Sequence, residues 1–140
     1  MKVFISHAPK DEFLAKRITN ALMENDFDVW NADTEILPGD NWAEKLSAAL
    51  EESDAMVALI SPESMQSGWV RREIEFALGK ESYNQRLIPV LLEPEKNFQE
   101  GSIPWILKHL KVIQIADPDQ VDEGILQITQ TLRENSLVFD

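Results

Sequence analysis

The stretch that decides the fold is Ala55-Met56-Val57-Ala58-Leu59-Ile60-Ser61, in which every residue except the last is apolar. A strand without polar residues between its apolar ones has no face for solvent, so it must be covered on both sides. Strands of this kind belong to parallel sheets that carry helices above and below. We therefore expect residues 55–61 to form a central strand of an α/β protein.

Shorter apolar runs lie on both sides of this strand, and amphipathic helical patterns separate them. Strands are expected at 3–6, 27–30, 86–92 and 112–115, and helices at 11–25, 41–52, 67–78 and 121–133, with a helical turn at 103–110. A crossover from one strand through a helix to a parallel strand is right-handed. The sequence thus predicts a doubly wound, three-layer domain of five parallel strands that spans residues 1–140.

Three loops of this predicted fold follow strand ends, at residues 6–11, 31–40 and 61–69. Doubly wound sheets bind ligands beyond the carboxyl ends of their strands, where the strand order reverses. Within the second loop, Pro38 and Gly39 form a turn, and Asp40 is expected to cap the helix that buries Trp42. The three loops are therefore where a site should be sought.

Composition excludes several classes of protein. The 140 residues include no cysteine, and the net charge of −12 opposes nonspecific binding to nucleic acid or to an anionic membrane. No apolar run approaches the roughly 20 residues that span a bilayer. The N-terminal apolar run, residues 3–5, is too short for a signal peptide. We expect a cytoplasmic protein with no membrane or nucleic-acid partner.

Familiar catalytic and cofactor motifs are missing from the sequence. It contains no GxGxxG, GxxxxGK[ST] or GxSxG string, and His7 and His109 lack the spacing of a zinc-binding HExxH motif. A phosphoacceptor domain of this architecture needs acidic residues at the ends of its first and third strands. Those ends are Ser6 and Ser61 here. We expect no bound metal and no resident cofactor.

The helix at 67–78 carries the strongest candidate for a functional residue. Ser67 is a suitable N-cap, Glu73 falls at the edge of the buried face, and Trp69 lies one turn earlier. Two interpretations are open: Glu73 pairs with an arginine while Trp69 is packing, or both belong to a site. The apolar residues that define the buried face are Val70, Ile74, Ala77 and Leu78.

The inventory at the predicted cleft suits a reaction that needs one acid. Cleavage of an N-glycosidic bond to a pyridinium qualifies, because the nicotinamide of NAD+ leaves as a neutral molecule. A single carboxylate can stabilise the ribosyl cation or trap it covalently, and an indole can stack on the pyridinium ring. The residues expected at the cleft are Glu73 with Phe4, Trp30, Trp42 and Trp69, and the polar Ser6, His7 and Asp33.

Several strings, taken together, resemble those of a TIR (Toll/interleukin-1 receptor) domain of the bacterial, NAD-consuming type. The resemblance is strong over residues 3–92 and looser to the end of the chain. Any one of the strings is weak evidence, whereas five in order with suitable elements between them are strong evidence. They are Val3 to Ala8 with Lys10-Asp11, Asp28 to Trp30, Leu37 to Asp40 with Trp42, Leu59 to Pro62, and Trp69 to Glu73.

The resemblance implies a flavodoxin-like sheet with strand order 2-1-3-4-5 and helices on both faces. It also implies that Glu73 is catalytic and that Trp69 belongs to the site. NAD+ is then a substrate, cleaved to nicotinamide and linear or cyclic ADP-ribose, which would serve as a signal to a separate effector in bacterial antiphage defence. The substrate-binding residues expected on this basis are Phe4, Ser6, His7, Asp33, Pro38, Gly39, Trp42 and Trp69.

The same resemblance implies self-association and leaves an alternative function open. Adaptor members of the family bind other TIR domains through the loop matching Pro38 and Gly39, and many TIR enzymes complete the active site with a neighbour's loop. As a non-catalytic homotypic adaptor, this protein would have Glu73 at its surface and Trp69 in its core.

One position departs from the pattern of the family. Relatives often carry Asp two residues after the second-strand Trp, where this chain has Ala32 followed by Asp33. Either the loop shifts by one residue and Asp33 serves, or a ribose contact is missing.

The other candidates have plain structural interpretations as well. Trp30, Trp42 and Phe4 are then core residues. Ser6 caps a turn, and His7 faces solvent.

Overall fold

The computed structural model describes residues 1–66, 68–79 and 86–138. The expected N-cap, Ser67, lies outside the described residues. The strands are β1 (Lys2–Ser6), β2 (Asp28–Trp30), β3 (Ala55–Ile60), β4 (Leu87–Leu91) and β5 (Ile113–Gln114). The α-helices are α1 (Glu12–Glu24), α2 (Ala32–Glu35), α3 (Trp42–Glu52), α4 (Pro62–Gln66), α5 (Gly68–Gly79) and α6 (Val121–Val138). The 3₁₀ helices are η1 (Pro9–Asp11), η3 (Glu95–Asn97), η4 (Trp105–His109) and η5 (Pro118–Gln120).

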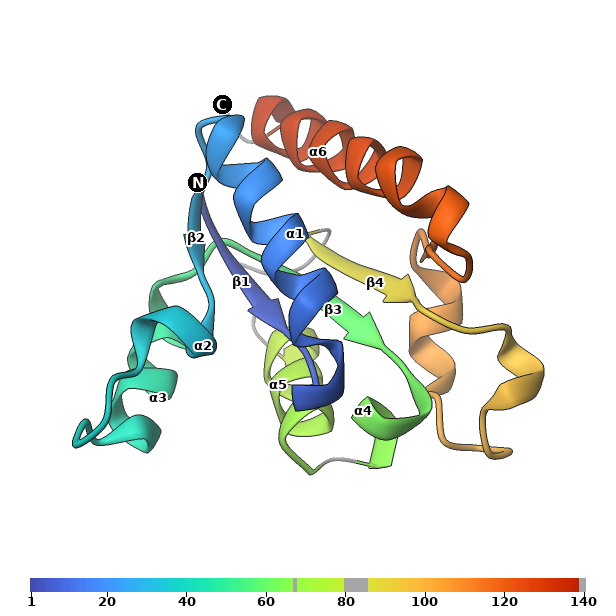
Figure 1. The fold of residues 1–140 in the computed structure, drawn as a ribbon, viewed down its shortest axis with the longest axis horizontal. Helices are drawn as coiled ribbons and strands as arrows, with labels where there is room; N and C mark the ends of the chain where they lie inside the picture. The colour runs from blue at the N-terminus through green and yellow to red at the C-terminus, as the bar shows by residue number, and fades with distance from the viewer. Residues whose placement is uncertain (67, 80–85, 139–140) are drawn as a thin grey trace.

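The strands form one parallel sheet in the order β2-β1-β3-β4-β5, which confirms the predicted flavodoxin-like topology. All six residues of β3 are buried, as expected of a strand covered on both faces. The strand order reverses between β1 and β3, since β1 lies between β2 and β3. In Figure 1 the strands run from the end bearing the N-terminus toward α2, α4 and α5.

Alternate residues of β1 and β3 enter two separate cores. Val3 and Ile5 pack with α1, which crosses in front of β1 in Figure 1, and with α6, which runs along the top of that view. Phe4 and Met56 pack on the other side, with α3 and α5. The side-chain alternation of a strand thus makes three layers. It also fixes which face Ser6 occupies, because Ser6 follows Phe4 by two residues.

Pro89 lies within β4 without breaking it. Leu91 directs its carbonyl oxygen to Ile115 on the β5 side, so Pro89, two residues earlier, faces that side too. The pairing between β4 and β5 begins only at Val90. The nitrogen of Pro89 therefore lies where the sheet demands no donor, as a proline in a strand requires.

Two short helices replace parts of the expected loops. α2 begins after Asn31, whose side chain accepts a hydrogen bond from the backbone N–H of Asp33. α4 begins at Pro62, directly after β3. Such helices of four or five residues leave no periodic apolar pattern, so hydrophobic spacing does not reveal them.

The cap expected at Asp40 is also wrong. Asn41 caps α3 by accepting from the N–H of Glu44, while Asp40 accepts from the N–H of Leu37 and pairs with Lys45 at 2.9 Å. These interactions lower the pKa of Asp40, with the Leu37 hydrogen bond as the largest cause. Asp40 therefore closes the Pro38-Gly39 turn rather than starting the helix.

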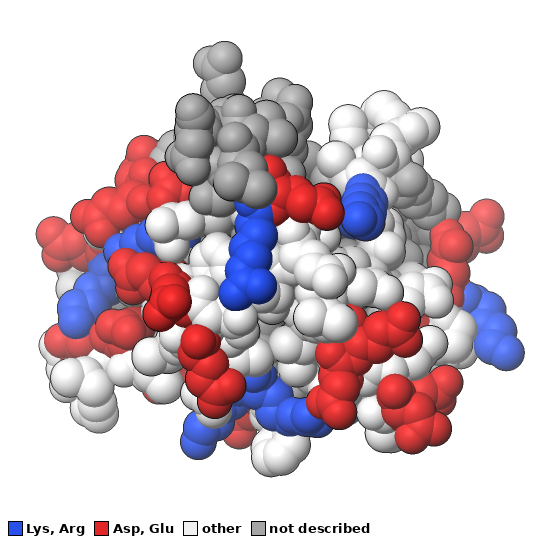
Figure 2. Space-filling model, turned by 90° about the horizontal axis from the view of Figure 1, so that it is seen from above, with Lys and Arg blue, Asp and Glu red and all other residues white. Residues whose placement is uncertain are grey.

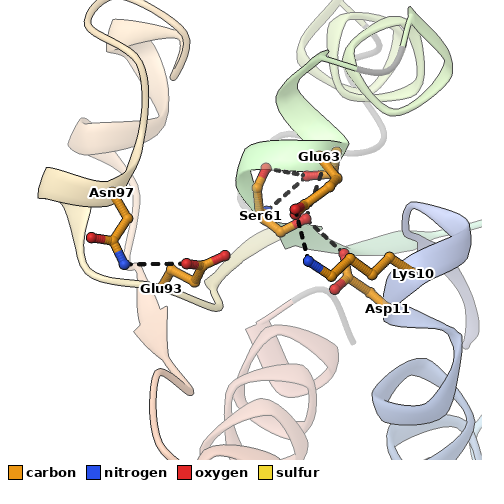
Figure 3. A network of polar contacts seen from close by, with 7 residues as sticks. Lys10, Asp11, Ser61, Glu63, Glu93 and Asn97 are labelled. Atoms are coloured by element: carbon orange, nitrogen blue, oxygen red, sulfur yellow. Dashed lines mark hydrogen bonds and ion pairs between the residues drawn. The ribbon is translucent and has the colours of Figure 1, made fainter.

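Polar contacts tie the ends of β1 and β3 together. The Oγ of Ser61 donates to Asp11 at 2.7 Å, and Lys10 pairs with Glu63 at 2.9 Å (Figure 3). Burial is the largest cause that raises the pKa of the Asp11 carboxyl group. These contacts hold η1 against α4, and α4 leads into α5. A separate contact in the same view joins Asn97 to Glu93.

Acidic side chains dominate the face shown in Figure 2, where the basic ones are scattered rather than gathered. This distribution agrees with the net charge of −12. In the part of the chain that the structure describes, no helix is long and apolar enough to cross a membrane.

Gly124 lets α6 approach the segment that follows β5. A Cβ atom at Gly124 would clash with the side chain of Ile115, whereas one at Gly79 would meet nothing within 4 Å. We expect Gly124→Ala to lower the free energy of unfolding by about 1–3 kcal/mol, because overpacking exceeds the gain in helix propensity. Chemical denaturation measures the change. Gly79→Ala is the matched control and should be neutral or slightly stabilising. Equal stability of both variants would contradict the close approach.

Candidate active site

Glu73 is a carboxylate held inside the apolar layer between the sheet and α5. Its neighbours on the helix face, Val70, Ile74 and Ala77, are buried, and Glu73 itself is only 9% exposed. The Oγ of Ser6, at the end of β1, donates to Oε1 of Glu73 over 2.7 Å. The expected position at the edge of the buried face is therefore confirmed. The expected stripe ends at Ala77, because Leu78 is exposed.

Burial raises the pKa of Glu73 to about 7. Loss of hydration disfavours the charged form of a carboxylic acid, and this is the largest cause of the shift. The hydrogen bond from Ser6 and the charge of His7 oppose it. Glu73 forms no ion pair with an arginine among the described residues, so the interpretation as a paired boundary residue fails.

His7 connects the end of β1 to α2. Its Nδ1 lies 2.8 Å from the carbonyl oxygen of Ala8, and its Nε2 lies 3.1 Å from Oδ2 of Asp33. Both ring nitrogens of His7 therefore lie within hydrogen-bond distance of an oxygen atom. The His7 side chain is only 6% exposed, which contradicts its interpretation as a solvent-facing loop residue.

A cavity of about 320 Å³ opens beside Glu73, at the carboxyl end of β1 and between α2, α3 and α5. This location is beside the point where the strand order reverses, as predicted. The volume falls at the lower end of the range of roughly 300–1,000 Å³ for ligand sites. Its wall includes Phe4, His7, Pro9, Ala32, Asp33, Ile36, Trp42, Leu46, Trp69 and Glu73.

Two tryptophans stand at the cavity with their rings edge to face. The centroids of Trp42 and Trp69 are 4.5 Å apart, with an angle of 83° between the rings, and both side chains are nearly half exposed. The guanidinium of Arg72 lies 5.6 Å from the Trp69 ring. The expected burial of Trp42 is wrong because α3 begins at the cavity, where this first residue meets Trp69 instead of the core.

The structure brings most of the sequence-predicted site residues together. Phe4, His7, Asp33, Trp42, Trp69 and Glu73 line the cavity. Ser6 lies behind Glu73 rather than in the wall, and Trp30 stacks on Phe4 with centroids 5.1 Å apart. Trp30 and Phe4 are both buried, so they are core residues, although the cavity reaches Phe4.

Pro38 and Gly39 do not contribute to the wall. They form an exposed turn in which the N–H of Asp40 bonds to the carbonyl of Leu37, and Gly39 has a φ of +91°. Glycine after proline suits this turn because its second central residue needs a positive φ. Any contact of this turn with substrate remains a prediction.

Three aliphatic residues of the wall, Ile5, Ile36 and Leu46, were not predicted from the sequence as site residues. Leu46 belongs to the apolar face of α3, and Ile36 follows α2. Periodicity identifies a buried side chain without showing whether it contacts other side chains or a cavity. Pro9 and Ala32 have side chains without a polar or reactive group, so their residue types do not mark them as site residues.

The arrangement offers one buried ionisable acid, Glu73, next to an aromatic wall, while the second carboxyl group of the wall, Asp33, is partly exposed and pairs with His7. A carboxylate in a poorly hydrated cavity stabilises an adjacent positive charge more strongly than one in water. Two indole rings provide a surface for a planar cationic ring. The site therefore suits a reaction in which positive charge passes from an aromatic ring to a carbon close to Glu73.

The sequence profile of a family described as TIR domain matches residues 3–129. A 2′ cyclic ADP-D-ribose synthase of Bacteroides thetaiotaomicron is 28% identical over 86 residues, which are 61% of this chain and 30% of that protein. A probable 2′ cyclic ADP-D-ribose synthase of Methanobrevibacter olleyae is 27% identical over 109 residues, covering 74% of this chain and 32% of that protein. The chain thus spans about a third of the length of these relatives.

Solved structures share the fold. The TIR domain of a Toll-related receptor from Hydra magnipapillata has a TM-score of 0.72 at 22% identity, with 94% of this chain and 97% of that chain covered. A TIR-STING receptor from C. gigas, in complex with 2′,3′-cGAMP, has a TM-score of 0.70 at 28% identity. That match covers 91% of this chain and 39% of the receptor chain.

Glu73→Gln should stabilise the protein in a pH-dependent way. The pKa of about 7 in the folded state exceeds the ordinary value of 4.5, so the unfolded chain ionises first as pH rises. The free energy of unfolding of the wild type therefore falls as the pH rises from 4.5 to 7, and Glu73 causes no further loss above pH 7. The advantage of the Gln variant should grow over that interval to about 3 kcal/mol. Chemical denaturation at a series of pH values measures it.

Glu75→Gln is the matched control, because Glu75 lies on the same helix with its side chain exposed. Its effect should not change over the same pH interval. An advantage of Glu73→Gln that is equal at low and neutral pH would contradict the assignment of a buried, late-ionising carboxyl group.

Proposed function

The chain belongs to the TIR domain family, and on this premise we propose that it cleaves the bond between nicotinamide and ribose in NAD+. The proposed product is ADP-ribose, released in a linear or a cyclic form. The names of the relatives from Bacteroides and Methanobrevibacter favour cyclisation. NAD+ is then a substrate and not a cofactor.

The observation that carries this proposal is the buried carboxylate of Glu73 beside two exposed indoles. Nicotinamide leaves NAD+ as a neutral molecule, so no general acid has to protonate it. As the bond breaks, positive charge moves to the ribosyl ring. Glu73 can stabilise this cation or add to it covalently, as one carboxylate does in retaining glycosidases. Trp69 offers a face for the pyridinium ring.

The dimensions of the cavity suit part of the dinucleotide. About 320 Å³ accommodates a nicotinamide ring and its ribose rather than a whole NAD+ molecule. Asp33, at the rim and 45% exposed, is the carboxylate available to a ribose hydroxyl. It takes the place of the acid missing at Ala32. The pyrophosphate and adenosine would then extend beyond the cavity.

The cyclic outcome depends on which nucleophile reaches the ribosyl cation first. Water gives linear ADP-ribose, whereas a hydroxyl or ring nitrogen of the same molecule gives a cyclic product. We propose that the product acts as a signal in antiphage defence, and that the reaction takes place in the cytoplasm.

The adaptor alternative fits the site less well. It requires Glu73 at the surface and Trp69 in the core, whereas Glu73 is 9% exposed and Trp69 is 48% exposed. Self-association remains compatible with catalysis. The turn at Pro38 and Gly39 is exposed and lies outside the cavity wall, so it is available to a neighbouring molecule.

Release of nicotinamide from NAD+ tests the proposal directly. Chromatography should show turnover by the wild type and a loss of about a hundredfold or more in Glu73→Gln, because the buried carboxylate beside the cation is removed. Trp69→Ala should lose about tenfold through weaker binding of the ring. No release by the wild type, even at high protein concentration or with a crowding agent, would refute the enzymatic function.

Two controls accompany these variants. Glu75→Gln removes an exposed carboxylate from the same helix. Trp105→Ala removes an exposed indole whose ring contact is with His109, outside the cavity. Both should retain wild-type turnover. Full activity of Glu73→Gln would show that the catalytic residue is wrongly assigned.

Specific activity should rise with protein concentration if a neighbour's Pro38-Gly39 turn completes the site. Gly39→Ala should weaken this dependence, because an L-residue is strained at a φ of +91° and the turn changes shape. Gly101→Ala is the matched control, with a φ of +78° in a loop away from the cavity. Initial rates over a thousandfold range of enzyme concentration measure the effect. A flat profile would indicate a monomeric enzyme.

A further inference from the structure

Ser6 is buried behind the cavity wall, unlike the other residues that were expected to contact the substrate. Its side chain is 1% exposed and is absent from the cavity wall. Its Oγ lies 2.7 Å from Oε1 of Glu73, the residue that does reach the cavity. Glu73 therefore separates Ser6 from the space that a substrate would occupy.

We propose that Ser6 is a positioning residue that fixes one oxygen of the Glu73 carboxylate and leaves the other for the ribosyl carbon. The proposal rests on the proposed function, because it assigns Ser6 a role in that reaction. It replaces the substrate contact expected from the sequence with an action through Glu73.

Ser6 can hold the Glu73 carboxylate rigidly because Ser6 lies on a strand and not on a loop. It is the last residue of β1 and is paired with Ala58 of β3 in the middle of the sheet. Phe4, two residues earlier on the same face, stacks on Trp30 in the core. Sites built on strands hold a functional group more precisely than sites built on mobile loops.

The hydrogen bond also connects two groups that burial would otherwise leave without a partner. A buried hydroxyl without a partner destabilises the folded state, and a buried carboxylate without a partner does so more strongly. Donation from Ser6 favours the ionised form of Glu73 against the effect of burial. The other titratable groups in the cavity wall are His7, after β1, and Asp33, on α2, and they pair with each other.

Ser6→Ala tests the proposal through the titration of Glu73. With ¹³C-labelled glutamate carboxyl groups, the Glu73 signal is identified by its absence in Glu73→Gln. Its midpoint should rise by about one pH unit in Ser6→Ala, since the hydrogen bond from Ser6 favours the ionised form of the carboxyl group. An unchanged midpoint would overturn the proposal. This measurement needs no turnover, so it remains decisive if the wild type does not cleave NAD+.

The kinetic readout separates positioning from substrate contact. For a pKa that rises from about 7 to about 8, the ionised fraction at pH 7 falls from roughly one half to one tenth. The kcat of Ser6→Ala at pH 7 should therefore fall about fivefold, with KM within about twofold of wild type, and recover by pH 9. A raised KM with an unchanged pH profile would show instead that Ser6 contacts substrate.

Two further variants make the result specific. Ser53→Ala removes another buried serine hydroxyl, which donates to the carbonyl of Ala49 at 2.6 Å before the start of β3. It should leave the Glu73 midpoint and kcat unchanged. If Ser6→Ala fails to fold, Ser6→Cys keeps a side chain of similar size with a weak donor. It should also raise the midpoint, and no rise would again overturn the proposal.

Discussion

The hydrogen bond between Ser6 and Glu73 is the interaction on which the candidate site depends. A carboxylate between a sheet and a helix costs free energy unless a partner meets it. β1 supplies the partner at its last residue, on the face that otherwise presents Phe4 to the core. The helix supplies Glu73 among Val70 and Ile74. The packing of α5 on the sheet therefore places the acid, and no flexible segment is needed to hold it.

The doubly wound topology provides the space in front of that acid. The connections from the ends of β1 and β3 diverge where the strand order reverses, so their helices cannot close over the sheet at this point. α2 and α3 form one side of the opening, and α5 forms the other. Contacts from Asp11 to Ser61 and from Lys10 to Glu63 hold the loops together beside it. The rigid frame and the open cavity thus have the same topological origin.

The fold could be read from the sequence because its signals are repeated along the chain. The apolar run of β3 fixed the class, and helical spacing located α1, α3, α5 and α6. The site could be predicted from the sequence only in part. Glu73 interrupts the apolar face of a helix, and the spacing of residues in the sequence is enough to detect such an interruption. The pairing of His7 with Asp33 and the exposure of Trp42 depend on how α2 and α3 pack, and neither leaves a local pattern.

A single acid imposes opposing demands on its surroundings. Removing water from Glu73 strengthens the attraction of its carboxylate for a cation. It also raises the pKa of Glu73, so that more of the group is protonated, and the protonated form has no such attraction. A value of about 7 leaves the group substantially ionised near neutral pH while keeping it poorly hydrated. One donated hydrogen bond moves this balance toward the charged form without filling the cavity. A second buried carboxylic acid beside Glu73 would supply protons that a neutral leaving group does not require, and its ionised form would raise the pKa of Glu73 further. The other carboxylate of the wall, Asp33, is partly exposed and pairs with His7 instead.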